Sequence, residues 1–125
     1  MLGIGAGDSV LYVERLLRFN DEPVVFDQIY LVADLFQGLT MERLSNETRS
    51  LYSLFENDFG VRMILAEERL RAVSADPRCA ELLAVAPGAP LLLVERTAYS
   101  YGNKPVEWRR GFYCTKRHHY RNDLG

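Results

Sequence analysis

Residues 10–31 read VLYVERLLRFNDEPVVFDQIYL, and residues 91–113 read LLLVERTAYSYGNKPVEWRRGFY. Both stretches place an apolar run before Val-Glu-Arg and continue to Pro-Val about ten residues later, which favours an internal repeat over chance. Only two copies occur, about 80 residues apart, so a solenoid of many short repeats is excluded. The repeat predicts a pseudo-symmetric domain with a β-hairpin in each half.

The composition is that of one soluble globular domain. The 125 residues are 48% hydrophobic and 26% charged, with a net charge of −2. A nucleic-acid-binding domain normally shows a basic footprint, so direct contact of this chain with DNA or RNA is not expected. No apolar run reaches the length of a membrane span, and no signal peptide is recognised at the N-terminus, so we expect a cytoplasmic protein. Cys79 and Cys114 are expected to be free thiols rather than a disulfide.

The first half of the chain predicts a hairpin followed by a helix. Strands are expected near 9–19 and 24–32, because turn-forming residues lie between them. A loop and a single helical turn at 40–44 should follow. A longer helix should begin between 46 and 50 and end at Gly60.

The second half predicts a strand, a helix and the second hairpin. Residues 61–73 have good helix propensity, yet their alternation also fits a strand, which we favour. Asp76 and Pro77 should open a helix that ends near Val85. The second hairpin is expected at 90–101 and 106–115. The element order β-β-α-β-α-β-β predicts an α+β domain, an antiparallel sheet with flanking helices.

Charged residues interrupt apolar rows on the predicted strands. Arg15, Arg96 and Asp27 each share a strand face with apolar side chains that we expect to face the core. An unpaired charge in a core costs several kcal/mol, so each needs a partner. Two interpretations remain open: an internal ion pair such as Arg15 with Asp27, or a cavity lined for a polar ligand. The apolar neighbours are Leu11, Val13, Leu17 and Phe19 for Arg15; Leu92, Val94 and Ala98 for Arg96; Val25, Ile29 and Leu31 for Asp27.

Polar residues of the last strand and of the central helix are further candidates. Glu107, Arg109 and Tyr113 share one strand face, and a carboxylate with a phenol suits recognition of a hydroxyl or an amine. A solvated outer face is the alternative. Ser50 and Tyr52 lie near the start of the central helix, where backbone N–H groups favour an anion. A plain helix cap is the alternative for Ser50, and surface or core packing for Tyr52.

Signals for catalysis or for a metal are weak. His118 and His119 are adjacent, so on a strand their rings would point in opposite directions. Neither cysteine has the spacing of a zinc site, and the glycine-rich segment 3–7 precedes a strand instead of following one. No carboxylate pair stands out for acid–base work. We therefore expect no catalytic residues, no metal site and no cofactor.

The ordered combination of motifs resembles the UTRA domain, the effector-sensing half of HutC-type regulators in the GntR family of bacterial transcription factors. The resemblance covers essentially all of residues 1–125. It rests on Leu2-Gly-Ile, Gly7-Asp8-x-Val10, Val13-Glu14-Arg15-Leu16, Glu22-Pro23-Val24, Ser50-Leu51-Tyr52, Ala80-x-Leu82-Leu83-x-Val85-x-x-Gly88, Arg96-x-x-Tyr99 and Pro105-Val106-Glu107 with Tyr113.

The resemblance implies a chorismate-lyase-like fold and a set of effector contacts. Arg15, Ser50, Tyr52, Glu107 and Tyr113 fall where relatives contact the effector, and Asp27 stands where many relatives carry glutamate. Relatives that sense phosphosugars tend to carry Arg-x-Arg where this chain has Arg15 and Leu17. A small or singly charged polar metabolite is therefore favoured over a phosphosugar.

The resemblance also implies partners. A winged helix-turn-helix precedes such domains and holds the operator, and residues 1–125 contain none. We expect a homodimeric, allosteric sensor that is not an enzyme and that meets DNA only through that further domain. A small lyase on the same fold is the alternative, since fold alone does not decide function. A purely structural dimerisation module is a third possibility and would have no cleft.

Overall fold

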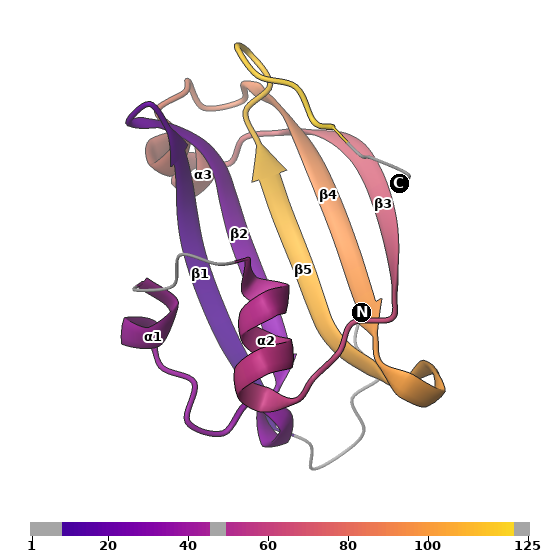
Figure 1. Cartoon of the computed structure of the whole chain (residues 1–125). Coiled ribbons are helices and arrows are strands. Elements are labelled where there is room, and N and C mark those ends of the chain that lie inside the picture. Colours follow the sequence, from indigo (N-terminus) through magenta and orange to yellow (C-terminus); the bar gives the residue numbers. More distant parts are fainter. Residues whose placement is uncertain (1–8, 46–49, 122–125) are drawn as a thin grey trace. The chain divides into compact units, whose positions relative to one another are not determined.

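The computed structural model describes residues 9–45 and 50–121. The motif at residues 2–8 therefore lies outside the described residues. Five strands form one antiparallel sheet in the order β1-β2-β5-β4-β3 (Figure 1). The strands are β1 Val10–Phe19, β2 Glu22–Val32, β3 Leu65–Ser74, β4 Pro90–Tyr99 and β5 Pro105–Tyr113; the helices are η1 Ala33–Phe36, α1 Met41–Ser45, α2 Leu51–Phe59, α3 Pro77–Leu83 and η2 Tyr101–Asn103.

Both hairpins of the sequence repeat are confirmed. The β1-β2 turn places Asn20 and Asp21 at φ values of 50° and 63°, the left-handed pair that a tight two-residue hairpin turn requires. The strand predicted at 61–73 is confirmed as β3. Pairing with β4 at the edge of the sheet therefore outweighs the helix propensity of this segment.

The chain divides into two compact units, and each takes a part of all five strands. Unit 1 comprises residues 1–13, 29–68 and 96–109; unit 2 comprises residues 14–28, 69–95 and 110–125. The units therefore cut across the strands and do not coincide with the two copies of the sequence repeat.

The core of unit 1 lies between α2 and the strands. Leu54 and Phe55 are fully buried against Ile29 and Leu31 of β2, as the predicted apolar stripe of this helix requires. Each such side chain contributes about 1.5–3 kcal/mol through its burial. Gly60 ends the helix in the left-handed conformation, at φ 67°.

The core of unit 2 is built around α3. Asp76 caps this helix by accepting a hydrogen bond from the backbone N of Cys79 at 2.7 Å, and Pro77 follows as its first residue. Cys79 packs with Phe26 of β2 in the same apolar cluster. Both cysteines are free thiols, as expected, and Cys79 is buried.

The row of β1 residues that we predicted to face the core is wrong at the C-terminal end of the strand. Val13 is buried, but Leu17 is 38% exposed and Phe19 is 59% exposed. In unit 2, α3 packs with Leu16, which lies on the opposite face of β1, so the cover that we expected over Leu17 and Phe19 lies on the other side of this strand.

Candidate functional site

Tyr52 of α2 connects two charged side chains in unit 1. Its hydroxyl accepts a hydrogen bond from Nη1 of Arg96 at 2.8 Å and donates one to Oε1 of Glu107 at 3.5 Å. Arg96 also donates from Nε and Nη2 to Oε2 of Glu68, at 2.9 and 2.6 Å. Tyr52, Arg96 and Glu107 were each predicted from the sequence as site residues, and unit 1 brings them together.

Ser50 is the N-cap of α2. Its Oγ accepts a hydrogen bond from the backbone N of Ser53 at 3.2 Å and donates to Oγ of the same residue at 3.0 Å. The cap fixes the first turn of the helix and thereby the position from which the Tyr52 side chain projects. The cap that we considered for Ser50 is thus confirmed, and its contact with an effector stays a prediction.

Glu107 is a fully buried carboxylate, with 0% of its surface exposed. Arg109, two residues further on the same strand face, donates from Nε to Oε1 and from Nη2 to Oε2, both at 3.1 Å. A buried carboxylate without a partner would be strongly destabilising, and Arg109 supplies that partner for Glu107. The alternative of a solvated face is therefore wrong at Glu107.

The electrostatics of unit 1 keep Tyr52 a neutral phenol. Burial raises the pKa of Tyr52, and the charge of Glu107 raises it further, while Arg109 and Arg96 act in the opposite direction without cancelling the rise. For Arg96, burial alone would lower the pKa, but Tyr52 and Glu68 raise it overall. At neutral pH Tyr52 can therefore both donate and accept a hydrogen bond.

Arg15 and Asp27 form the predicted ion pair in unit 2. Nε of Arg15 lies 2.9 Å from Oδ2 of Asp27, whose side chain is 2% exposed. The second oxygen, Oδ1, is buried and has no hydrogen-bond partner among the described residues. One interpretation, the ion pair, is thus confirmed. The other interpretation, a cavity lined for a polar ligand, stays a prediction.

Gly111 of β5 lies against this carboxylate. A Cβ atom at this position would lie 2.9 Å from Oδ1 of Asp27 and 2.8 Å from Cε1 of Tyr113, both closer than real contacts allow. Tyr113 also packs edge-on against Tyr120, with ring centroids 5.3 Å apart. Unit 2 therefore brings Asp27 and Tyr113 together at this glycine, and Arg15 joins them through its ion pair with Asp27.

Two participants were missed in the sequence. Glu68 lies in residues 61–73, the segment whose sequence fitted both a helix and a strand. Its pairing with Arg96 could be named only once the order of the strands was known. Gly111 carried a usable signal, because a glycine inside a strand pattern often marks a close approach of another group.

No group of three His, Cys, Asp or Glu side chains among the described residues is arranged to hold a metal ion. No helix within 9–45 or 50–121 has the length and apolar content needed to cross a membrane.

Residues 1–119 match the sequence model of the UTRA domain. The chain is 35% identical over 102 residues to the HTH-type transcriptional regulator Rv0792c of Mycobacterium tuberculosis, covering 79% of this chain and 37% of the relative. It is 32% identical over 110 residues to the HTH-type transcriptional repressor STM4068 of Salmonella typhimurium, covering 87% of this chain and 44% of the relative. The chain thus spans less than half the length of these two curated relatives.

A solved structure agrees with the fold. The ligand-binding domain of a protein assigned to the GntR family of transcriptional regulators, from Bordetella bronchiseptica, superposes with a TM-score of 0.92 at 48% identity. The match covers 99% of this chain and 78% of that structure.

Proposed function

Because the chain belongs to the UTRA domain family, we propose that it is the effector-binding domain of a bacterial transcription regulator of the GntR family and HutC type. The observation that carries the proposal is the buried Oδ1 of Asp27, which lacks a partner among the described residues beside the Arg15 guanidinium. A buried acceptor of this kind is costly when unsatisfied, and a ligand that donates a hydrogen bond would remove the cost.

The effector that fits these groups is a small polar metabolite with at most one negative charge. Asp27 accepts a hydroxyl or an amine, and Arg15 uses its remaining N–H groups for a carboxylate or another acceptor. A phosphate dianion favours two or more free cationic donors. Arg15, Arg96 and Arg109 are each already paired with a carboxylate.

For Tyr52, Ser50 and Glu107, the effector contacts implied by the family stay predictions, and so does the ligand-lining role that strand alternation suggested for Arg96. The Tyr113 hydroxyl is proposed as a further contact, because the Tyr113 ring lies next to Gly111 and the Asp27 carboxylate. Tyr113→Phe should therefore weaken effector binding by about 1–3 kcal/mol, the loss of one buried hydrogen bond.

The effector would act by linkage between two sites. Binding stabilises one arrangement of the domain, and the affinity of the DNA-binding part of the regulator changes by the same coupling free energy. We propose a homodimer as the assembly. Its support is that β3 is an edge strand and exposes Leu65 and Leu70, which a partner would cover.

Calorimetry with a panel of hydroxy acids, amino acids and sugar phosphates tests the proposal. Asp27→Asn should weaken binding of the effector at least about tenfold, because the charged acceptor is lost. Asp21→Asn, in the exposed β1-β2 turn, is the matched control and should bind as the unmodified chain does. A sub-micromolar sugar phosphate ligand would contradict the proposed effector class. Conversion of the bound ligand would favour the lyase alternative.

A further inference from the structure

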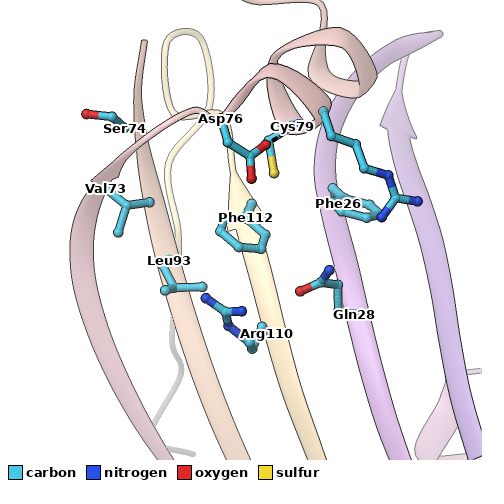
Figure 2. A pocket seen from close by; sticks show the side chains of 10 residues that line it. Phe26, Gln28, Val73, Ser74, Asp76, Cys79, Leu93, Arg110 and Phe112 are labelled. Atoms are coloured by element: carbon cyan, nitrogen blue, oxygen red, sulfur yellow. Dashed lines mark hydrogen bonds between the residues drawn. The ribbon is translucent and has the colours of Figure 1, made fainter. Parts of the chain in front are cut away.

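Unit 2 contains a pocket that none of the predicted site residues lines. Its volume is about 310 Å³, at the lower end of the range for small-molecule sites. Phe26 and Gln28 of β2, Leu93 of β4, and Arg110 and Phe112 of β5 contribute to its walls, together with the start of α3 (Figure 2). Arg15, Asp27 and Tyr113, the predicted residues of this unit, are not among them.

Arg110 is the distinctive group of this pocket. Its Nε atom is buried and makes no hydrogen bond within the described part of the chain. The guanidinium carbon lies 5.3 Å from the ring centroid of Phe112, so the arginine rests on an aromatic face. An arginine stays charged at all physiological pH values, and a buried donor without an acceptor is costly. This geometry calls for an acceptor, and an anionic one satisfies both the charge and the donor.

The second arginine of the pocket is already neutralised. Nη1 and Nη2 of Arg78 donate to the two carboxylate oxygens of Glu14 at 2.7 and 2.6 Å. Cys79 adds no charge either, because burial raises the pKa of its thiol to about 11. One positive group, Arg110, therefore remains for a ligand.

The other end of the pocket carries a negative charge. Figure 2 shows Arg110 and Gln28 at one end and the Asp76 carboxylate and Cys79 sulfur at the other, with the Phe112 ring between them. Phe26 and Leu93 are buried and Phe112 is half-buried, so the middle of the pocket is apolar. A ligand with one anionic end and an apolar body fits this order, whereas a second anionic group at its far end would meet Asp76.

We infer that this pocket is a second ligand site, which takes a small monocarboxylate with an apolar body. Arg110 binds the carboxylate through Nε and a terminal nitrogen, as a planar fork binds a planar anion. The apolar body lies against Phe112 and Leu93. The site is separate in its residues from the effector contacts proposed above and does not depend on them.

Benzoate is a suitable probe, with benzamide as its neutral counterpart of the same shape. Binding is measured by ¹H–¹⁵N NMR, following both backbone amides and the Nε–H signal of Arg110. We expect benzoate to shift this signal and to bind about ten- to hundredfold more tightly than benzamide. Terephthalate, which carries a second carboxylate opposite the first, should bind more weakly than benzoate.

Variants separate this site from others. Arg110→Gln should weaken benzoate binding about ten- to hundredfold, and Arg110→Lys should keep part of it. Arg18→Gln, an exposed arginine of β1, is the matched control and should change nothing. Filling the pocket by Val73→Phe should weaken benzoate binding even if Arg110→Gln fails to fold.

Three outcomes would overturn the inference: equal binding of benzoate and benzamide, no binding at about 1 mM protein and ligand, or binding lost in Arg15→Gln but kept in Arg110→Gln. The last outcome would place benzoate at the Arg15 and Asp27 pair instead.

Discussion

Gly111 and Asp27 are in contact so close that residue 111 has no room for a side chain. A Cβ atom there would lie 2.9 Å from Oδ1 of Asp27. The glycine therefore belongs to the environment of the carboxylate, since any larger residue would push Asp27 or the Tyr113 ring out of place.

Gly111→Ala tests this relationship. An alanine that fits its backbone usually stabilises a protein slightly. Here we expect a loss of about 1–3 kcal/mol in the free energy of unfolding, because the buried carboxylate must move. Urea denaturation measures the loss, and the NMR signal of the Arg15 Nε–H should shift. Gly102→Ala has open space around it but a φ of 68°, so it should strain its own backbone and still leave that signal unchanged.

Glu107→Gln should lower the free energy of unfolding more than the removal of a charge from a solvent-exposed ion pair does. It removes the carboxylate that holds Arg109 in a buried fork, which costs about 3 kcal/mol or more. Glu14→Gln breaks an equally well-formed fork with Arg78 that is exposed to solvent, and it should cost less than about 1 kcal/mol. Equal losses in urea denaturation would mean that burial is not what makes the Glu107 pair important.

The two helix caps should differ in their dependence on pH. The backbone N–H of Cys79 holds the pKa of Asp76 below its ordinary value of 3.8. The stabilisation that the ionised Asp76 cap gives to α3 is therefore present above pH 3.8. It is lost as the pH falls through the lowered pKa of Asp76. Asp76→Ala should cost about 1 kcal/mol at pH 7 and less near pH 3. Ser50→Ala should cost a similar amount at both pH values, because a hydroxyl does not titrate there.

Cys79 should react slowly with iodoacetamide in the folded protein. The thiolate is the reactive form, and a pKa of about 11 leaves little of it at pH 8. Cys79 is also only 4% exposed, whereas Cys114 is half-buried. Peptide mapping by mass spectrometry should find Cys114 labelled first. In urea the two rates should become similar, and a fast reaction of Cys79 without urea would contradict the packing of α3.

The sequence predicted the strands, the two longer helices and the Arg15–Asp27 ion pair, but not the remaining side-chain pairings. Alternation placed Arg15, Asp27 and Arg96 among apolar neighbours, because parity alone decides which residues of a strand share a face. The pairing of Arg96 with Glu68 required the order of β3 and β4 in the sheet, which no local pattern encodes. Arg110 was overlooked for a related reason: its strand face is covered by α3, a helix about thirty residues away in sequence.

The exposure of Leu17 shows a second limit of the alternation argument. Parity says which residues share a face but not which face is covered. The side that receives a helix depends on where each connection crosses the sheet, and that is a property of the whole chain.

Within unit 1, the two ion pairs that contact Tyr52 are complete without α2. Arg109 neutralises Glu107, and Glu68 neutralises Arg96, so Tyr52 adds only hydrogen bonds from a neutral hydroxyl. A displacement of α2 would thus leave no buried ion alone, and its polar cost would be about 1–2 kcal/mol. The burial of Leu54 and Phe55 in the apolar core of unit 1 is what holds the helix in place. Displacement of α2 would therefore break the hydrogen bonds of Tyr52 and expose an apolar face, but it would separate no ion pair.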